Sequence, residues 1–255
     1  MALNFANTTA DRVDMGSSST LDNLQASTIC AWVYRTTTRV SGQIYAKGSF
    51  ANQTRNPAFG LRGNDGSTLS LLVDRATTDL NLTGNNASSA TLPLNTWAFA
   101  VAAYDTSTNP QMFMGTLTAE VSEVSYATQT LGSGTIGDNT AELGCVGNAS
   151  LAGTQDKSFP GIIGFISIYN RRLTLGEIQQ QQFSPYVTSG CIYFSHLGFN
   201  GTGNQVDWSG NKNTGTVTSA TYSSHVPLKP VWGFQTARPP YFNPYPKKLS
   251  LIGVG

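Results

Sequence analysis

The sequence is poor in charged side chains. They make up 11% of its 255 residues, whereas an average soluble chain has about 25%. The 15 lysines and arginines nearly balance the 14 aspartates and glutamates, which leaves a net charge of +1. Because a nucleic-acid-binding surface needs clustered Lys and Arg, this composition predicts no nucleic-acid partner.

Cysteine and histidine are also scarce. The chain has three cysteines, Cys30, Cys145 and Cys191, and two histidines, His196 and His225. No C-x-x-C pair occurs, which argues against a Cys/His zinc site. An odd number of widely spaced cysteines favours buried free thiols, and a disulfide between two of them is the alternative.

Long apolar runs and an export signal are absent as well. Apolar stretches such as "IIGFISIY" are far shorter than the ~20 residues of a membrane span, so we expect no membrane association. The opening residues, "MALNFANTTADRV", have neither the basic region nor the apolar core of a signal peptide. We therefore expect synthesis in a cytoplasm without export by the usual route.

Short strand-like segments fill the chain instead. Examples are "STICAWVYR", "TLSLLVD", "TWAFAVAAYD" and "GIIGFISIYN", separated by clusters of Gly, Asn, Asp and Ser. Segments of this length, enriched in β-branched and aromatic residues, predict an all-β protein. The expected architecture is an antiparallel β-sandwich or jelly roll.

One short helix is expected within "LTLGEIQQQQF". Thr174 is placed as its N-cap with Glu177 three residues later, which is the pattern of a capping box. Leu175, Ile178 and Phe183 would form the side that faces the sandwich. The proline that follows, Pro185, would end the helix, so the prediction is two to three turns.

The acidic residues do not form a glycosidase pattern. Such a site needs two carboxylates about 5–9 Å apart on one sheet face, which on a strand requires even spacing. Two pairs have odd spacing, Asp11/Asp14 and Glu120/Glu123. A third pair, Asp138 and Glu142, lies in the glycine-rich "GSGTIGDNTAELG", where we expect a loop. Neither histidine is near a G-x-S-x-G motif. The pattern predicts a protein without catalytic residues.

Four motifs in order carry a resemblance to a known family: "STICAWVYRTT", "GQIYAKG", "LNTWAFAVAAYD" and "FPGIIGFISIYNRRLTLGEIQQ". Up to about residue 185, the chain resembles a laminin-G-like domain of the concanavalin A-like jelly roll. The last motif is the most specific, because a strand, a two-arginine turn and a capped helix must coincide. One departure is Gly164-Phe165, where the family often has Asp-Glu. The resemblance implies that Trp32 and Trp97 are core residues.

The segment "GCIYFSHLGFNGTGNQVDWSGNKNTGTVTSATYSSH" resembles a strand and loop that family members usually carry before their opening strand. A circularly permuted domain would explain its position after the helix, because the termini of such a fold lie close together. The alternative, a truncated second repeat, would have too little core to be stable alone. We therefore expect one domain over residues 1–224, closed by strands within 190–222, and an extended arm over 225–255.

The resemblance also raises the question of calcium, which many laminin-G-like domains bind. Asp207, Asn211 and Asn213 in "DWSGNKNTG" could supply oxygen ligands to such an ion. Only one of them is charged, and Asx side chains also stabilise turns by binding backbone N–H groups. Turn stabilisation is favoured here, so we expect no metal or cofactor, with calcium as the alternative.

The C-terminal arm is apolar and lacks carboxylates. From His225 onward it contains six of the 11 prolines and five aromatic residues. Exposed aromatic rings are unfavourable in water, so we expect the arm to dock on a neighbouring subunit or a capsid shell. The residues expected to make this contact are Trp232, Phe234, Tyr241, Phe242, Tyr245, Lys247 and Lys248.

Laminin-G-like domains usually act outside cells, yet the sequence shows no export signal. A phage structural protein would act outside cells without an export signal, because it assembles in the host cytoplasm and is released by lysis. The resemblance and the arm together predict a non-enzymatic, homo-oligomeric virion protein, a decoration protein on a tailed-phage capsid. The alternative is a carbohydrate- or receptor-binding module on a phage tail or a cell surface, with a glycan as partner.

Overall fold

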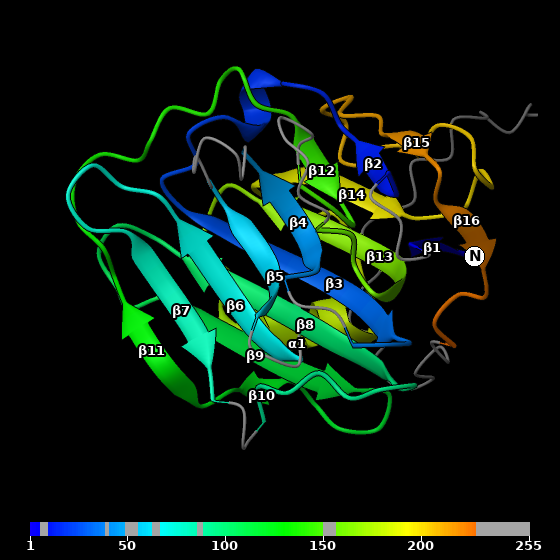
Figure 1. Ribbon diagram of the computed structural model, residues 1–255, viewed down its shortest axis with the longest axis horizontal. Coiled ribbons are helices and arrows are strands. Elements are labelled where there is room, and N and C mark those ends of the chain that lie inside the picture. Colours follow the sequence, from blue (N-terminus) through cyan, green and yellow to red (C-terminus); the bar gives the residue numbers. More distant parts are fainter. Residues whose placement is uncertain are drawn as a thin grey trace, which may run out of the picture.

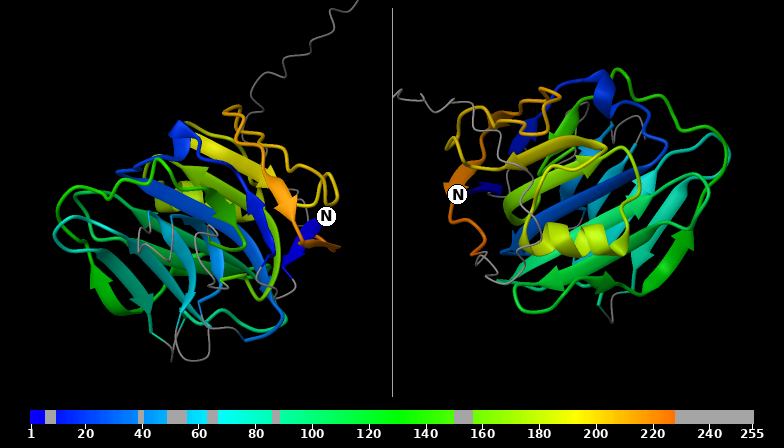
Figure 2. Two further views of the ribbon diagram at one scale, coloured as in Figure 1. Left: turned by 45° about the horizontal axis from the view of Figure 1, so that its top comes forward. Right: turned by 180° about the vertical axis from the view of Figure 1, so that it is seen from behind.

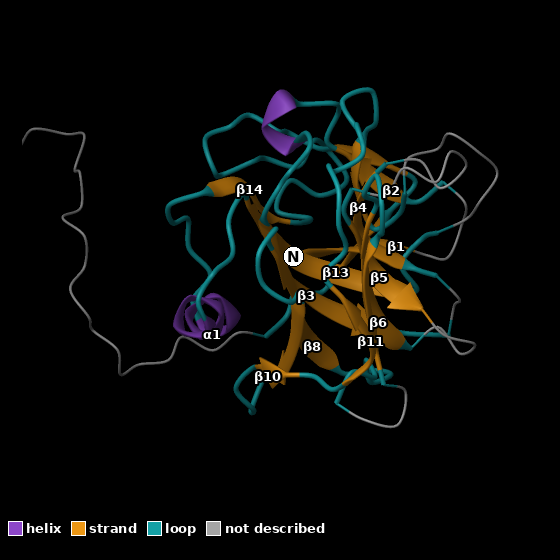
Figure 3. Ribbon diagram, turned by 90° about the vertical axis from the view of Figure 1, so that its left-hand side faces the viewer, coloured by secondary structure: helices purple, strands orange, loops and turns teal. Residues whose placement is uncertain are grey.

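A computed structural model describes residues 1–5, 10–38, 41–48, 56–62, 67–85, 89–149 and 157–227. Two antiparallel sheets stack face to face in this part of the chain, and a helix lies on the outside of one of them (Figures 1 and 3). The all-β sandwich predicted from the strand spacing is therefore confirmed.

The first sheet, called sheet A, has eight strands in the described part of the chain. Its order is β10-β9-β8-β3-β13-β1-β16, and β14 also pairs with β13. The bounds are β10 (Ser122–Glu123), β9 (Gln111–Thr116), β8 (Trp97–Tyr104), β3 (Ser27–Arg35), β13 (Gly161–Tyr169), β1 (Ala2–Phe5), β16 (Thr221–Ser223) and β14 (Cys191–His196).

The second sheet, called sheet B, also has eight strands within the described ranges, in the order β11-β7-β6-β5-β4-β12-β2-β15. A short 3₁₀ helix, η1 (Ser19–Leu21), follows β2 in the chain. The strand bounds are β11 (Tyr126–Thr130), β7 (Leu80–Gly84), β6 (Thr68–Val73), β5 (Ala58–Arg62), β4 (Gln43–Lys47), β12 (Gly144–Val146), β2 (Arg12–Asp14) and β15 (Thr216–Thr218).

The main core lies between the two sheets. Side chains alternate along each strand, so one face of each sheet points inward. Strand β3 contributes Ile29 and Val33, while β5 and β6 contribute Phe59 and Leu71, and all four are fully buried or nearly so. The short strand-like segments of the sequence thus supply the interior of the sandwich.

Sheet A is buried on its outer face as well. There Trp32, Phe99 and Phe165 form a second apolar cluster with Ile178 of helix α1 (Leu175–Phe183). Figure 2 shows α1 lying across this sheet in the view from behind. The prediction that Trp32 is a core residue is confirmed, whereas Trp97 is only half-buried at the edge of the same cluster.

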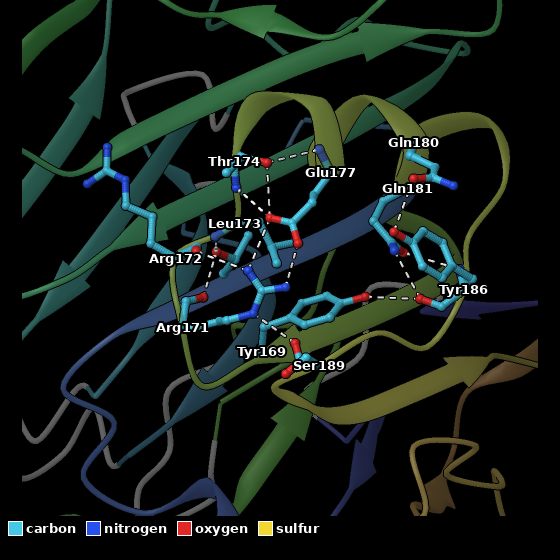
Figure 4. A network of polar contacts seen from close by, with 11 residues as sticks. Tyr169, Arg171, Arg172, Leu173, Thr174, Glu177, Gln180, Gln181, Tyr186 and Ser189 are labelled. Carbon is cyan, nitrogen blue, oxygen red and sulfur yellow. Dashed lines mark hydrogen bonds and ion pairs between the residues drawn. The ribbon is translucent and has the colours of Figure 1, made fainter. Parts of the chain in front are cut away.

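Helix α1 begins with the predicted capping box (Figure 4). The Glu177 backbone N–H donates to the Thr174 hydroxyl at 3.3 Å, and the Glu177 carboxylate accepts the Thr174 backbone N–H at 2.8 Å. Arg171 adds a second restraint, because its guanidinium lies 2.6 Å from the Glu177 carboxylate. The last residues before the helix therefore fix where it starts.

The buried side of α1 differs from the prediction. Ile178 is fully buried as expected, but Leu175 is 48% exposed, and the other buried residues of the helix are Gln181 and Gln182. The Gln182 amide can be buried because its oxygen and nitrogen are both hydrogen-bonded to backbone groups near the end of β9. A prediction that counts only apolar side chains overlooks an amide that is buried because its hydrogen bonds are all made.

The segment 190–222 supplies strands to both sheets. Strand β14 pairs with β13 and β16 pairs with β1 in sheet A, while β15 pairs with β2 in sheet B. The first two strands of the chain therefore each lie beside one of its last described strands. Figure 1 shows the N-terminus next to β16.

The three cysteines Cys30, Cys145 and Cys191 are free and buried, as the sequence predicted. Burial raises the pKa of each thiol above its usual range. The thiols therefore stay protonated at neutral pH and pack as small apolar groups.

The described chain stops shortly after the arm begins. Val226 is buried in the outer cluster of sheet A, and the ring of His225 lies 5.9 Å from that of His196. No helix in the described ranges is long and apolar enough to cross a bilayer. The predicted docking residues lie outside the described residues, namely Trp232, Phe234, Tyr241, Phe242, Tyr245, Lys247 and Lys248.

Candidate functional site

The outer faces of the two sheets differ. Helix α1 covers sheet A, and the edge-on view shows sheet B on the side away from that helix (Figure 3). In β6, Leu69 and Leu71 enter the core. Alternation along the strand places Thr68, Ser70 and Leu72 on the outer face. A polar surface is thus produced by the same alternation that builds the core.

One row of residues crosses five strands of this face in register. Gln43 of β4 lies opposite Gly60 of β5, and Gly60 lies opposite Ser70 of β6. Ser70 is opposite Thr83 of β7, which in turn is opposite Thr128 of β11. We call these five residues the polar row. Direct cross-strand neighbours have Cβ atoms about 4.5–5.5 Å apart, so the row is a nearly continuous strip of amide and hydroxyl groups.

Two further rows flank the polar row. On one side Ala58 lies opposite Leu72, and Leu72 lies opposite Asn81. On the other side Arg62 lies opposite Thr68. The face therefore changes from small apolar side chains, through the polar row, to a cationic side chain.

Two hollows are sunk into this surface. The first has a volume of about 170 Å³ and is lined by Ser41, Gln43, Ala58, Leu61, Arg62, Ser70, Leu72 and Lys157. The second has about 440 Å³ and is lined by Arg62, Asn81, Thr83, Gly84, Asn85, Ala127 and Thr128. Because both are lined by Arg62, we treat them as one feature, called the groove. The larger hollow falls in the range of about 300–1,000 Å³ that is usual for ligand sites.

Gly60 leaves room for the Gln43 side chain within the polar row. A Cβ atom built at this position would lie 2.8 Å from the Gln43 Cα and 2.9 Å from its Oε1, and closer still to the Gly42 carbonyl oxygen. No larger residue fits there without moving the backbone of β4. The Gln43 side chain lies in the space that a side chain at position 60 would need.

Gln43 carries an unsatisfied acceptor. The residue is only 5% exposed, and its Nε2 donates to the Ser41 carbonyl at 3.0 Å. Its Oε1 is buried and has no hydrogen-bond partner. Leaving a buried acceptor unpaired costs about 1–3 kcal/mol, so a donor from a ligand in the first hollow would be bound favourably.

The side chains of the predicted calcium loop make bonds within the protein. The Asp207 carboxylate accepts three backbone N–H groups at 2.9–3.1 Å. The amides of Asn211 and Asn213 donate to the carbonyls of Cys191 and Ile192. Calcium needs six to eight oxygen ligands directed at one point, and this arrangement does not fit it.

Acidic side chains lie elsewhere in the described chain. Asp14 binds Arg12 at 2.7 Å, and Glu123 accepts hydrogen bonds from Gln111 and Tyr126. No carboxylate is among the residues that line the groove. A general acid and base pair is therefore missing from the described lining of this site.

The exposed tryptophan of the described chain lies away from the groove. Trp208 is 49% exposed and packs edge-on against Phe199, with the ring centroids 5.6 Å apart. Neither ring lines the groove. Polarity in the groove comes from amides, hydroxyls and cations, and its apolar part from small aliphatic side chains.

Comparison with known proteins places these features in context. A model of the concanavalin A-like lectin/glucanases superfamily, of the Laminin_G_3 type, matches residues 7–179. A search of curated proteins gave no match. A solved structure of "a putative carbohydrate binding protein" from Bacteroides ovatus has the same fold, with a TM-score of 0.56 and 13% sequence identity. The similarity covers 89% of this chain, which spans only 61% of that protein.

Two other solved structures are more distant. The SAP-like pentraxin from Limulus polyphemus has a TM-score of 0.48 at 14% identity, over 87% of this chain and 94% of the pentraxin. The enzymatically active domain of bacteriophage CBA120 tailspike protein 2 also has a TM-score of 0.48, at 12% identity, over 76% of this chain and 32% of that one. Both scores are too low to support a functional comparison.

Proposed function

The chain belongs to the concanavalin A-like lectin/glucanases superfamily, and we propose that it is a carbohydrate-binding module whose ligand lies in the groove. The observation that carries the proposal is the polar row, which lines up amide and hydroxyl groups across five strands. The Bacteroides ovatus protein, which shares the fold, is described as carbohydrate binding, and this supports the same ligand class.

The groove offers the groups that a saccharide needs. Sugar hydroxyls both donate and accept hydrogen bonds. The Thr83 hydroxyl donates to the Asn81 amide oxygen at 3.3 Å, which leaves the Thr83 oxygen and the Gln43 Oε1 as acceptors and the Asn81 Nδ2 as a donor for a sugar. Ala58 and Leu72 provide an apolar surface for the C–H groups of a sugar ring. Because these side chains stand on paired strands, little ordering is needed on binding.

The experiment is titration calorimetry of the full chain against a panel of oligosaccharides. Thr83→Val removes one hydroxyl without changing the shape of the side chain. It should weaken binding about 2- to 10-fold, the value of one hydrogen bond of about 0.5–1.5 kcal/mol. Thr221→Val, on the exposed edge strand β16, is the matched control and should bind normally. Binding to no member of the panel, or equal losses in both variants, would contradict the proposal.

The arm supports a second role, which is compatible with the first. We propose that the protein is a non-enzymatic, homo-oligomeric decoration protein of a tailed-phage capsid, attached through its C-terminal arm, residues 225–255. The arm has five aromatic residues, six prolines with Pro227 included, and no carboxylate, and its prolines reduce the entropy lost on docking. The described beginning of the arm, at Val226, already packs against the domain.

Particle assembly tests this second role. Removing residues 228–255 should leave a folded domain that no longer joins the particle. Counting copies per purified particle separates two locations, because hundreds of copies indicate the capsid and a few tens or fewer indicate the tail. Full occupancy by the shortened chain would exclude docking through the arm.

A further inference from the structure

The charges in the groove are of one sign. Among the described lining residues, the charged ones are Arg62, which lines both hollows, and Lys157, which lines the first. All other lining residues are neutral. A concave site with charges of one sign concentrates ligands of the opposite charge.

Arg62 is available for a ligand. It is the last residue of β5 and is exposed. Other described arginines are used within the protein: Arg12 binds Asp14, Arg171 binds Glu177, and Arg172 lies 3.5 Å from Asp105. Across the described ranges, no ion pair or side-chain hydrogen bond involves Arg62. Its guanidinium therefore keeps its full set of donors.

Gln43 gives a second and independent indication. Its Oε1 is unpartnered, the residue is 95% buried given its 5% exposure, and the side chain lines the hollow that Arg62 also lines. An acceptor in this position needs a donor, and a sugar hydroxyl supplies one. The first hollow thus contains a cation that can bind an acidic group and an acceptor that can bind a hydroxyl group.

We propose that the groove binds an acidic saccharide, with the carboxylate of a uronic-acid unit on Arg62 and a hydroxyl of the same or the next unit donating to Gln43 Oε1. The assignment rests on the proposed carbohydrate-binding function and specifies its ligand class. A guanidinium matches a carboxylate in shape, because two parallel N–H groups can bind its two oxygens. A sulfate ester presents the same negative charge with another geometry.

The experiment compares an oligomer of galacturonic acid with its fully methyl-esterified form, by titration calorimetry on the full chain. The two ligands have the same sugar units and linkages and differ at the carboxyl group, which is an anion in the acid and a neutral methyl ester in the other. The acid form should bind at least 10-fold more tightly at low salt, and the difference should shrink as salt screens the interaction. A sulfated neutral oligomer of equal length is the third ligand.

Three variants and one control test which residues cause the preference for the acid form. Arg62→Gln should weaken binding of the acid form far more than binding of the ester and so abolish the preference for the acid form, while Arg62→Lys should retain part of that preference. Gln43→Leu should weaken both forms to a similar extent, and thermal melting would verify that this variant is folded. Lys212→Gln removes an exposed cation outside the groove and should change neither ligand.

The outcomes separate this inference from the function on which it rests. Equal binding of acid and ester would overturn the acidic ligand and leave carbohydrate binding intact. Tighter binding of the sulfated oligomer than of the uronate would overturn the carboxylate assignment. Failure of every oligosaccharide, neutral ones included, would overturn both proposals.

Discussion

Gln182 shows how one residue can link a helix to a sheet. Its Oε1 accepts the Val121 backbone N–H at 2.7 Å, and its Nε2 donates to the carbonyls of Thr116 and Ala119 at 2.8 and 2.7 Å. The Trp32 indole N–H donates to the Gln182 backbone carbonyl at 2.8 Å. The amide thus pairs with the buried Val121 N–H and the Thr116 carbonyl, and it adds a second donor to the Ala119 carbonyl, which also accepts the Thr116 backbone N–H.

Replacing Gln182 should therefore destabilise the fold strongly. Gln182→Leu keeps the volume but removes all three bonds and leaves the buried Val121 N–H without its partner. We therefore expect a loss of about 1–3 kcal/mol in the free energy of unfolding. Urea denaturation measures this loss. Gln179→Leu, on the same helix, is the control and should change stability by less than about 0.5 kcal/mol. Similar values for the two variants would show that the Gln182 bonds are not important.

The bonds of Asp207 lead to a prediction about metals. Its carboxylate is fully used by three backbone N–H groups, so folding should not depend on calcium. Excess EDTA should shift the melting temperature by no more than a few degrees, because a tightly bound ion would stabilise the protein by mass action. A larger drop that calcium reverses, and that Asp207→Ala abolishes, would contradict this.

At the scale of elements, the start of α1 combines a cap with an ion pair. Hydrogen bonds from Arg171, with further contributions from Thr174, hold the pKa of Glu177 at about 2, below its usual 4.5. A carboxyl group with a lowered pKa in the folded state stabilises the protein above its unfolded pKa. That contribution decreases as the pH falls from 4.5 towards 2.

A pH series on a variant tests this. Glu177→Gln should melt at a lower temperature than the wild type at pH 7, and the gap should narrow as the pH falls from 4.5 to 2. The side chains are partly exposed, so the difference should also decrease with salt. Thermal melts at several pH values measure it. If the difference in melting temperature stays constant down to pH 2, the destabilisation comes from helix propensity and not from charge.

The sequence predicts the strands and the helix cap, but it does not predict the groove. The capping box depends on Thr174 and Glu177, three residues apart, so local spacing is sufficient. The alternation of "TLSLLVD" likewise indicates which side chains of β6 point outward. Neither pattern indicates that Ser70 meets Gly60 and Thr83, because register depends on pairing between distant strands.

Two irregularities show why the groove could not be predicted. The pairing of β4 with β5 shifts between Gln43 and Tyr45, and that of β11 with β7 shifts between Tyr126 and Thr128. Each shift lies beside an end of the polar row. Such bulges turn a side chain to a chosen face, and no residue pattern in these strands marks their positions. That Arg62 lacks a partner within the described ranges is likewise not evident from the sequence, because its neighbours in the fold are not known.

At the scale of the whole molecule, the strands from 190–222 close both sheets. The resemblance suggested that they form one circularly permuted domain with the rest of residues 1–224, and this stays a prediction. Without them, β13 would lose β14, β1 would lose β16, and β2 would lose β15. Bare strand edges of this kind pair with other chains.

Truncation after Phe183 tests the single-domain prediction. The shortened chain should be insoluble or molten, with exposed apolar surface and without a cooperative melting transition. Dye binding and near-ultraviolet circular dichroism would show this state. Shortening the chain after residue 227, which keeps every described strand, is the control and should melt cooperatively. A monomeric fragment 1–183 with a sharp transition would refute the single-domain prediction.

The pairing of β1 with β16 also governs how the chain is made. Strand β1 leaves the ribosome before β16, so Leu3 meets Tyr222 only after some 220 further residues have been added. At about 5–20 residues per second, this interval is roughly 10–40 s. Until the last strands are made, the nascent chain has unpaired edges at β13, β1 and β2 and lacks the core residues that follow the helix. Slower growth at low temperature, or a chaperone that covers those edges, should therefore raise the yield of correctly folded protein.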